Sequence, residues 1–417
     1  MNHIEVWLCD DSLGPDALVG HLTVSTGRSG DAIRFDYDDD WLANKTSLPS
    51  FDLEPSLAAF PGPHHPSADN TLFGIFRDTS PDRWGRVLME RREILNARAD
   101  ARPVRTLVEW DFLLGVADAG RMGALRLRNP ETRQFVADSE FPVPPVARLR
   151  ELENIVSELE KADAEDQPEY RAWLMQLTAP GTSLGGARPK ASYIDTDGSM
   201  WLAKFPASDD RRDIGNWEYL AAKLAGRCGI VMPDTRIHEF SNRGHTFAAK
   251  RFDRVGASRR LYASAMTLSG RREGEPASYL DIAEVIETQG EPANIRADLE
   301  QLFRRVLFSI LIGNRDDHLR NHGFLRGRNG WKLSPAFDIN PNPEKAAHAL
   351  AIDEADPSPI TASLIASRDY YRLTLKQTQE IEAEIRGVVT GWKTQAENLG
   401  IARQEISTME PVIDPGR

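Results

Sequence analysis

Apolar and polar positions alternate in short stretches near the start of the chain, with glycine, aspartate and serine between the stretches. Successive side chains of a strand point to opposite faces of a sheet, so this pattern predicts strands over 4–8, 18–24 and 32–37. The proline-rich stretch from Pro49 to Pro66 predicts an irregular connection. We therefore expect the N-terminal part of the chain to be rich in β-structure.

Apolar residues three or four positions apart follow the proline-rich stretch, and this spacing predicts helices. Ser80-Pro81-Asp82 is typical of a helix start, because serine can cap a helix and proline fits its first turn. The expected elements are helices over 83–98, 106–114 and 149–162 and a strand over 124–127.

The pattern changes again at Ser183, where glycines precede two apolar stretches, 191–194 and 200–205. A turn at Asp197-Gly198 joins these stretches, which predicts a β-hairpin. Further predicted elements are a helix over 216–225, a strand over 245–251 and a long apolar helix over 299–312. Strands with some helix come first and a largely helical half follows, which indicates an α+β fold.

Composition narrows the class of protein. The 417 residues are 41% hydrophobic and 27% charged, which is ordinary for globular proteins and excludes disorder over the whole chain. The 51 basic and 63 acidic side chains leave a formal net charge of −12, so this chain is a poor candidate to grip nucleic acid alone.

Cysteine content and hydropathy exclude further classes. Two cysteines, Cys9 and Cys228, exclude a disulfide framework or a cysteine-rich zinc module and fit a reducing compartment. No apolar run approaches the ~18 residues that a membrane span needs, and the N-terminus lacks the features of a signal peptide. We expect a cytoplasmic protein without a membrane partner.

A glycine-containing loop, Ser183-Leu-Gly-Gly-Ala-Arg-Pro-Lys190, opens the predicted hairpin. Glycines let backbone N–H groups approach phosphate oxygens, and Lys190 could add a positive charge, but a plain hairpin turn explains the same residues. Lys204 ends the second strand, where kinases place the lysine that holds the ATP phosphates, with Glu218 as a reasonable partner. The simpler alternatives are an edge lysine and a solvated glutamate.

The strongest chemical signal follows the long apolar helix. Asp316 and Asn321 have the Asp-x-x-x-x-Asn spacing of the kinase catalytic loop, in which the aspartate accepts the substrate's hydroxyl proton. Asp338 follows an apolar strand at the position of a metal-binding aspartate. Asn321 and Asp338 would offer the oxygen ligands that Mg²⁺ prefers. For Asp338, a turn or a helix cap is the alternative.

A metallohydrolase site is a competing interpretation of the same loop. Carboxylates beside a histidine, here Asp316, Asp317 and His318, can bind a metal ion, and His322 and His348 could complete the set. No His-Glu-x-x-His motif is present, however. His318 has a structural alternative as a buried imidazole that bonds the loop backbone.

Together these motifs resemble the HipA-type serine/threonine kinases, the toxin halves of HipBA toxin–antitoxin modules. The resemblance covers nearly the whole chain, and its motifs occur in the family's order: 183–190, 201–206, 216–225, 250–254, 312–321 and 334–338. It implies a two-lobed, protein-kinase-like α+β fold with a β-rich N-terminal part and an all-helical C-terminal lobe. The implied domains are a β-rich subdomain over 1–130, a kinase N-lobe over 131–255 and a helical C-lobe over 256–417.

The resemblance also implies a role for individual residues. The loop that holds the ATP phosphates would comprise Gly185, Gly186, Ala187 and Lys190, with Lys204 on the same phosphates. Ser183 would be the serine whose autophosphorylation switches such kinases off.

The remaining implied residues form the hinge and the catalytic loop. Lys250, Arg251 and Phe252 would contact adenine through backbone groups, and Asp253 would lie near the ribose; an internal Arg–Asp pair is the alternative for this segment. The catalytic loop would comprise Asp316 as base with His318 and Asn321, and Asn321 and Asp338 would hold Mg²⁺.

The resemblance implies an ATP- and Mg²⁺-dependent protein kinase that restrains growth as a toxin. Its partners would be a HipB-like helix-turn-helix antitoxin, through which it would reach DNA, and a protein substrate such as an aminoacyl-tRNA synthetase or another translation factor. The alternative is a kinase-like binding module that acts as a corepressor with the antitoxin.

Overall fold

The computed structural model describes residues 1–27, 30–46, 48–67, 71–137, 143–178 and 188–416. The chain forms two compact units, each built from two segments. The first unit comprises Met1–Ser208 and Arg251–Ala263, and the second comprises Asp209–Lys250 and Ser264–Arg417. No helix of the described residues is long and apolar enough to cross a membrane.

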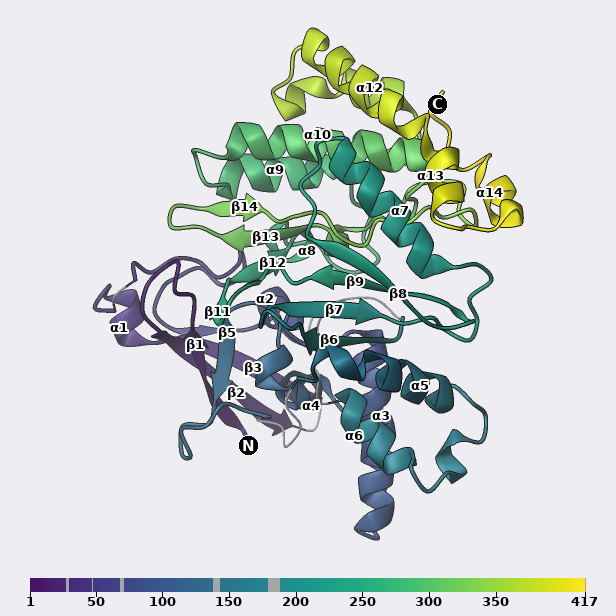
Figure 1. Ribbon diagram of the computed structural model, residues 1–417. Coiled ribbons are helices and arrows are strands. Elements are labelled where there is room, and N and C mark those ends of the chain that lie inside the picture. Colours follow the sequence, from purple (N-terminus) through teal and green to yellow (C-terminus); the bar gives the residue numbers. More distant parts are fainter. Residues whose placement is uncertain (28–29, 47, 68–70, 138–142, 179–187, 417) are drawn as a thin grey trace. The chain divides into compact units, whose positions relative to one another are not determined.

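A five-stranded antiparallel sheet with the order β4-β3-β2-β1-β5 dominates the start of the first unit (Figure 1). Every second residue of β1 is fully buried, as expected for a strand with one covered face. The structure therefore confirms the predicted N-terminal strands. Their bounds are β1 His3–Leu8, β2 Ala17–Gly27, β3 Gly30–Tyr37, β4 Pro63–His64 and β5 Leu125–Arg128.

Helices and two hairpins complete the first unit. The helices are α1 Asp39–Leu42, α2 Gly74–Arg77, α3 Arg83–Ala99, α4 Glu109–Gly115, α5 Leu149–Leu159 and α6 Tyr170–Thr178. The predicted hairpin is β6 Lys190–Ile194 with β7 Met200–Lys204, and a shorter one pairs β10 Arg254–Val255 with β11 Ser258–Arg259.

The start of α3 differs from the prediction in its cap. The Asp82 carboxylate accepts the N–H of Gly85 at 2.8 Å, which makes Asp82 the N-cap. The hydroxyl of Ser80, which the sequence suggested for this task, donates to the carbonyl of Phe76 instead. An aspartate satisfies the free N–H groups of a first helical turn as well as a serine does, so the helix begins directly after it.

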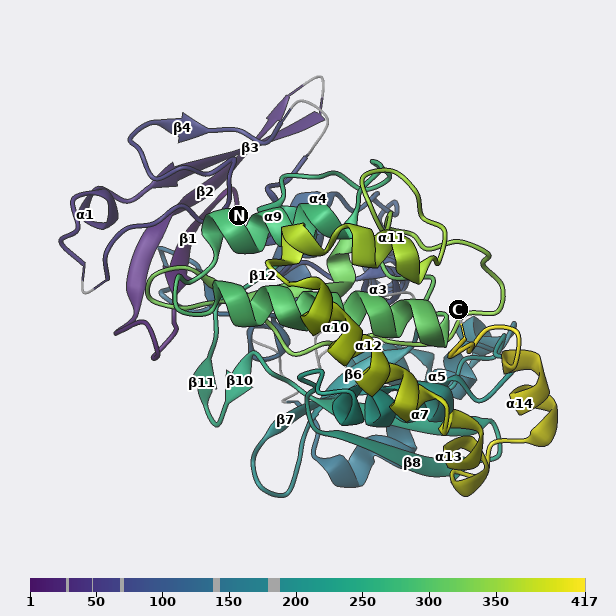
Figure 2. The ribbon, with the colours of Figure 1, turned by 90° about the horizontal axis from the view of Figure 1, so that it is seen from above.

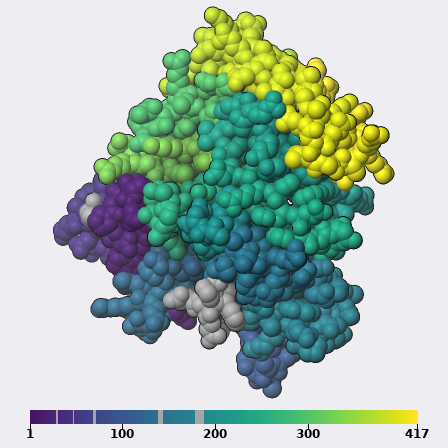
Figure 3. Space-filling model, viewed as in Figure 1, coloured from purple at the N-terminus to yellow at the C-terminus, as the bar shows by residue number. Residues whose placement is uncertain are grey.

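The second unit is built around the long apolar helix α10, Ile295–Ile312. Helices α9 (Tyr279–Gln289) and α12 (Leu375–Val389) pack against α10. In both ribbon views α9 runs beside α10, whereas α12 runs obliquely to it (Figures 1 and 2). The C-terminal helices form a continuous part of this unit's surface (Figure 3). The other helices are α7 Ile214–Arg227, α8 Ala265–Leu268, α11 Thr361–Ala366, α13 Trp392–Asn398 and α14 Arg403–Met409.

Strands also occur in the second unit, so the C-terminal part is not all-helical as the resemblance implied. The hairpin of β13 (Gly323–Arg326) and β14 (Trp331–Leu333) connects the predicted catalytic loop to Asp338. A further hairpin pairs β8, Thr235–Ser241, with β9, Gly244–Lys250. The short strand β12 covers Tyr262–Ser264, where the chain passes from the first unit to the second.

Both cysteines are buried and unpaired with each other, in agreement with the prediction of no disulfide framework. Burial raises the pKa of the thiol of Cys9 to about 12, and burial does the same for Cys228. Thiolates form only well above neutral pH at these positions, so neither side chain is a ready nucleophile.

A buried carboxyl group makes the first unit sensitive to pH. Glu54 accepts the N–H of Ile75, in α2, at 2.5 Å, and it also accepts the hydroxyl of Ser56. Burial outweighs these hydrogen bonds and raises the pKa of Glu54 to about 7. The protonated form is therefore favoured in the folded state.

We expect the free energy of unfolding to fall as the pH rises from about 4.5 through about 7, because the folded state favours the protonated form of Glu54. The stabilisation from protonated Glu54 is complete below the ordinary pKa, and its loss above pH 7 amounts to roughly 3 kcal/mol. Urea denaturation at a series of pH values checks this effect. In Glu54→Gln the change over this window should be smaller than in wild type, and equal pH slopes for the two proteins would contradict the assignment.

Candidate active site

The loop after α10 is fixed at its base by a tightly packed helix end. Gly313 caps α10 in the left-handed conformation, and a Cβ there would clash with the side chain of Val412. The side chain of Asn314 donates to the hydroxyl of Ser309 at 3.3 Å. These contacts fix the direction in which the loop leaves the buried helix α10. The loop then continues into the 3₁₀ helix Leu319–Asn321.

Asp316 is the exposed acid of this loop, with 59% of its side chain accessible. Its carboxylate forms an ion pair with the ammonium group of Lys345. The side-chain amide of Asn321 donates to the backbone carbonyl of Asp316 at 3.2 Å. The structure thus brings the predicted base and the predicted metal ligand into one braced loop and leaves the carboxylate accessible.

Asp317 points the other way and is buried. Its carboxylate accepts the hydroxyl of Tyr279 at 2.8 Å and lies 2.9 Å from Nε2 of His322. Burial raises the pKa of Asp317, but the neighbouring imidazole of His322 and the hydrogen bond from Tyr279 outweigh burial and hold it below its ordinary value. The two adjacent acids therefore differ in role: Asp316 is exposed, whereas Asp317 fixes the loop to Tyr279 and His322 in the protein interior.

This division argues against a metallohydrolase site. In the described part of the chain, no three histidine, cysteine, aspartate or glutamate side chains are grouped closely enough to hold a metal ion. Nδ1 of His318 is buried and has no hydrogen-bond partner among the described residues, so the expected bond from this imidazole nitrogen to the loop backbone is not seen.

Asp338 has an unusual backbone, with φ at +59°. Non-glycine residues adopt this left-handed conformation rarely, and it often marks a functional site. Two backbone hydrogen bonds hold the segment after Asp338 against the catalytic loop: Asn340 donates to the side chain of Asn314 at 3.2 Å, and Asn342 donates to the carbonyl of Gly313 at 2.8 Å.

These hydrogen bonds connect the segments that carry the two predicted metal ligands. The side chain of Asn321 bonds Asp316 through its amide nitrogen, and no described residue donates to its carbonyl oxygen. An amide oxygen and a carboxylate suit a hard cation such as Mg²⁺, so the donor set fits the ion that the sequence predicts.

The predicted loop glycines Gly185 and Gly186, Ala187 and the predicted autophosphorylation site Ser183 fall outside the described residues. Of the predicted phosphate-binding residues, Lys190 and Lys204 are described, and both lie in the first unit. Lys204 ends β7, opposite Lys190 in the register of the hairpin, and is partly exposed. The position of Lys204 agrees with the expected strand end.

Lys190 does not fit the phosphate role that the resemblance implied. Its ammonium group lies 2.6 Å from the carboxylate of Asp82, and the two side chains are only 1% and 2% exposed. Burial raises the pKa of Asp82, and the charge of Lys190 opposes this rise. The lysine is therefore committed to a buried ion pair with the cap of α3.

We expect Lys190→Met to destabilise the protein by about 3–5 kcal/mol, because it leaves the carboxylate of Asp82 buried without its cation. Urea denaturation measures this loss, and calorimetry measures ATP affinity on the same sample. Lys204→Met is the matched control, with weaker ATP binding and a smaller loss of stability expected. Lys190→Met with native stability and lost ATP binding would restore the phosphate role.

The predicted hinge contains a buried ionic cluster. The carboxylate of Asp253 accepts from Arg251 at 2.7 Å and 2.9 Å, from Arg254 at 2.5 Å and from the N–H of Gly123 at 2.8 Å. The side chains of Asp253 and Arg251 are 1% and 2% exposed. Both carboxylate oxygens are occupied, so the expected ribose contact of Asp253 is corrected to the internal Arg–Asp pair.

The adenine contact of the other hinge residues stays a prediction. Two of their N–H groups already have partners, since Lys250 donates to the carbonyl of Asp234 at 2.8 Å and Arg251 donates to that of Met200 at 2.9 Å. Lys250 ends β9, and its ammonium group lies 3.9 Å from a carboxylate oxygen of Asp234. The ring of Phe252 lies 6.0 Å from the ring of Tyr262, in a tilted arrangement.

Two residues beside the catalytic loop were not predicted from the sequence. Lys345 forms the ion pair with Asp316, and its carbonyl accepts the guanidinium of Arg315. Asn314 connects the loop to the segment after Asp338. Lys345 lies seven positions beyond Asp338 in a proline-containing stretch without periodicity, so only the repeated asparagines of this region could have drawn attention to it.

Family models match two stretches of this chain. The HipA N-terminal domain matches residues 13–141, and the HipA-like C-terminal domain matches residues 182–396. The chain belongs to the HipA family. HipA from Shewanella oneidensis MR-1, solved in a toxin–antitoxin complex with HipB and operator DNA, matches 98% of this chain and 95% of its own, with a TM-score of 0.60 and 16% identity.

That structural match shows a HipA-like fold for this chain, and its sheets and helices confirm the α+β class. A putative kinase from Haemophilus influenzae is 26% identical over 190 residues, or 39% of this chain and 54% of the relative. The putative kinase Y4dM from Sinorhizobium fredii is 25% identical over 244 residues, or 51% and 56%. The matched regions thus cover a little over half of each of these relatives.

Proposed function

We propose that this HipA-family protein is an ATP- and Mg²⁺-dependent serine/threonine kinase. The observation that carries the proposal is the braced loop with exposed Asp316, hydrogen-bonded to the segment that follows the left-handed Asp338. Kinase catalysis consists mainly of positioning and charge stabilisation, and this loop offers one accessible base and two oxygen ligands.

Each catalytic role then falls to one side chain of this chain. The substrate hydroxyl lies against Asp316, which takes its proton as the oxygen forms a bond to the γ-phosphorus of ATP and the bond to ADP breaks. Asn321 and Asp338 would hold Mg²⁺, which neutralises charge on the phosphates when bound. Lys345 must yield part of its contact with Asp316 when the hydroxyl arrives.

The remaining assignments concern nucleotide binding and regulation. Lys204 and the backbone of Gly185, Gly186 and Ala187 would hold the phosphates, and the backbone of Lys250, Arg251 and Phe252 would face adenine. Ser183 is proposed as the autophosphorylation site. His318 belongs to the catalytic loop. The proposed domains are 1–130, 131–255 and 256–417.

The proposed biological setting is a toxin–antitoxin module. A HipB-like helix-turn-helix antitoxin would be the partner, because the similar Shewanella HipA was solved together with HipB and operator DNA. The complex would bind operator DNA, since the net charge of −12 disfavours DNA binding by this chain alone. A translation factor such as an aminoacyl-tRNA synthetase is the proposed class of substrate.

Transfer of labelled phosphate from ATP tests the proposed activity. The purified protein is first dephosphorylated and then incubated with labelled ATP and Mg²⁺, with and without EDTA. Label on Ser183, mapped by mass spectrometry and absent with EDTA, is the expected result. ATP binding without any transfer, to itself or to proteins of a lysate, would favour the binding-module alternative.

A further inference from the structure

Lys345 lies beside the proposed base in the second unit. Its ammonium group pairs with Oδ1 of Asp316, and Oδ2 has no partner among the described residues. The side chains of Lys345 and Asp316 are 46% and 59% exposed. An ion pair this exposed adds little to stability, so folding alone does not explain the position of this lysine.

The backbone that leads to Lys345 is bonded to the catalytic loop. Asn342 donates its N–H to the carbonyl of Gly313 at 2.8 Å. The carbonyl of Lys345 itself accepts the guanidinium of Arg315, which directly precedes Asp316 in the chain. The carbon stem of Lys345 therefore starts from a fixed point beside the proposed base.

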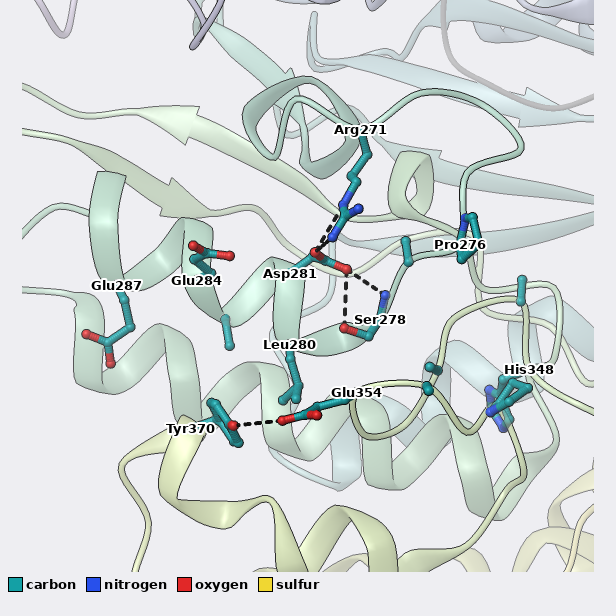
Figure 4. A pocket seen from close by; sticks show the side chains of 16 residues that line it. Arg271, Pro276, Ser278, Leu280, Asp281, Glu284, Glu287, His348, Glu354 and Tyr370 are labelled. Atoms are coloured by element: carbon teal, nitrogen blue, oxygen red, sulfur yellow. Dashed lines mark hydrogen bonds and ion pairs between the residues drawn. The ribbon is translucent and has the colours of Figure 1, made fainter.

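The backbone after Lys345 is fixed as well. It continues into the wall of the pocket shown in Figure 4, in which His348 is labelled. In that wall the N–H of Ala349 donates to the carbonyl of Arg315 at 3.1 Å. Because its backbone is held on both sides, Lys345 can change its contacts through its side chain alone.

The proposed reaction brings two negative charges close together at this position. The phosphoryl group in transfer carries negative charge on its three equatorial oxygens. The carboxylate of Asp316 adds a further negative charge, and like charges at short range repel each other. Within the described residues, Lys345 is the one basic side chain that pairs with this carboxylate. Its positive charge offsets the repulsion.

The ammonium group of Lys345 can reach both negative groups during the reaction. A hydroxyl group bonded to a carboxylate lies about 2.7 Å from it, and reacting atoms approach to about 3–3.5 Å before transfer. The γ-phosphorus is then within roughly 6 Å of the carboxylate of Asp316. An ammonium group has three N–H donors on a flexible stem of four carbons. One donor can therefore stay on Asp316 while another meets an oxygen of the phosphoryl group.

We propose that Lys345 is a catalytic residue whose ammonium group binds an oxygen of the phosphoryl group during its transfer from ATP. The inference rests on the proposed kinase function and adds a cation to its mechanism. The substrate's hydroxyl oxygen forms a bond to the γ-phosphorus, its proton passes to Asp316, and the electron pair of the broken P–O bond leaves with ADP. Lys345 stays protonated throughout and stabilises the charge of the transition state.

The kinetics of self-labelling with ATP test this role. In Lys345→Met the maximal rate should fall about 100-fold, because the lost contact forms in the transition state. The ATP concentration that gives half of this rate should change by less than about twofold. Lys345→Arg keeps the positive charge and should retain more than about a tenth of the wild-type rate. Thermal melting confirms that each variant is folded.

Lys393→Met, on α13, is a matched control. Lys393 pairs with Glu410 at 2.8 Å, and these side chains are 52% and 50% exposed, much like the pair of Lys345 with Asp316. The control variant should label itself at the wild-type rate. An equal loss of rate in Lys393→Met and Lys345→Met would assign the effect to surface charge and overturn the proposal.

A binding measurement detects the contact without turnover. Tetrafluoroaluminate is a planar anion that takes the place of the phosphoryl group in transfer, and calorimetry measures the affinity for ADP and Mg²⁺ with and without it. In wild type we expect the anion to tighten ADP binding about tenfold or more. In Lys345→Met this gain should fall to about twofold or less, with the affinity for ADP alone unchanged. A gain that is absent in wild type, or equal in the two proteins, would contradict the proposal.

The outcomes separate this inference from the proposed function. Equal labelling rates in wild type and Lys345→Met would leave the kinase in place and exclude the catalytic role of Lys345. A faster rate in Lys345→Met would mean that the lysine restrains Asp316, which also excludes that role. If the variant lost the tetrafluoroaluminate gain but wild type transferred no phosphate, the phosphoryl contact would stand and the kinase activity would not.

Discussion

Asp316→Asn should lower the rate of phosphoryl transfer roughly 1,000-fold, because the substrate's hydroxyl group then has no carboxylate to accept its proton. Stability should change little, since the side chain is 59% exposed and its ion pair with Lys345 lies at the surface. ATP affinity should also persist. The measurement is the initial rate of labelling with saturating ATP, alongside calorimetric titration of ATP.

A matched control separates this effect from a change of surface charge. Asp39→Asn removes another exposed carboxylate, at the start of α1, and should leave the rate unchanged. If Asp316→Asn retained more than a tenth of the wild-type rate, Asp316 would not be the base. The adjacent Asp317 could not simply replace it, because it is buried against Tyr279 and His322.

Asp253→Asn should give the largest loss of stability, more than about 3–5 kcal/mol. The neutral side chain cannot balance the two guanidinium groups of Arg251 and Arg254, which are buried beside it. Arg251 also donates to the carbonyl of Gly120 and the hydroxyl of Ser192, so the cluster joins distant parts of the first unit. Urea denaturation, or the soluble fraction after expression, measures the loss.

The same cluster predicts how acid acts on the first unit. Burial raises the pKa of Asp253, but the charges of Arg251 and Arg254 outweigh burial and hold it well below the ordinary value of 3.8. The stabilisation is therefore complete above the ordinary value and is lost only as the pH falls towards the lowered one. Native stability of Asp253→Asn together with a raised KM for ATP would instead support a ribose contact.

Local periodicity was sufficient to predict most elements of this fold. The strands β1, β2 and β3 and the helices α3 and α10 follow alternating or helical apolar patterns, which depend only on neighbouring residues. The strands β8 and β13 were missed, whereas β14 is the apolar strand expected before Asp338. All seven positions of β8 remain at least partly exposed, and β13 has only four residues, so neither shows a clear apolar pattern.

The candidate site residues also form two groups: some positions depend on local spacing, and others depend on partners that are distant in the sequence. The spacing of Asp316 and Asn321 is local, and the structure brings both into one loop. The positions of Lys190 and Asp253 depend on partners far away in the sequence. Lys190 meets Asp82 across 108 positions, and Asp253 meets Gly123 across 130. The sequence alone shows a lysine after glycines, but it does not show that this lysine forms an ion pair with the buried carboxylate of Asp82.

The burial of both native thiols makes this protein convenient for site-specific labelling. Cys9 and Cys228 are the only cysteines, and burial raises the pKa of each to about 12. A maleimide dye at neutral pH should therefore react far faster with one cysteine introduced at the surface than with either native residue. A dye attached through Tyr370→Cys, at an exposed position of the 3₁₀ helix Arg368–Tyr371, would report changes at that surface by fluorescence without prior removal of the native cysteines.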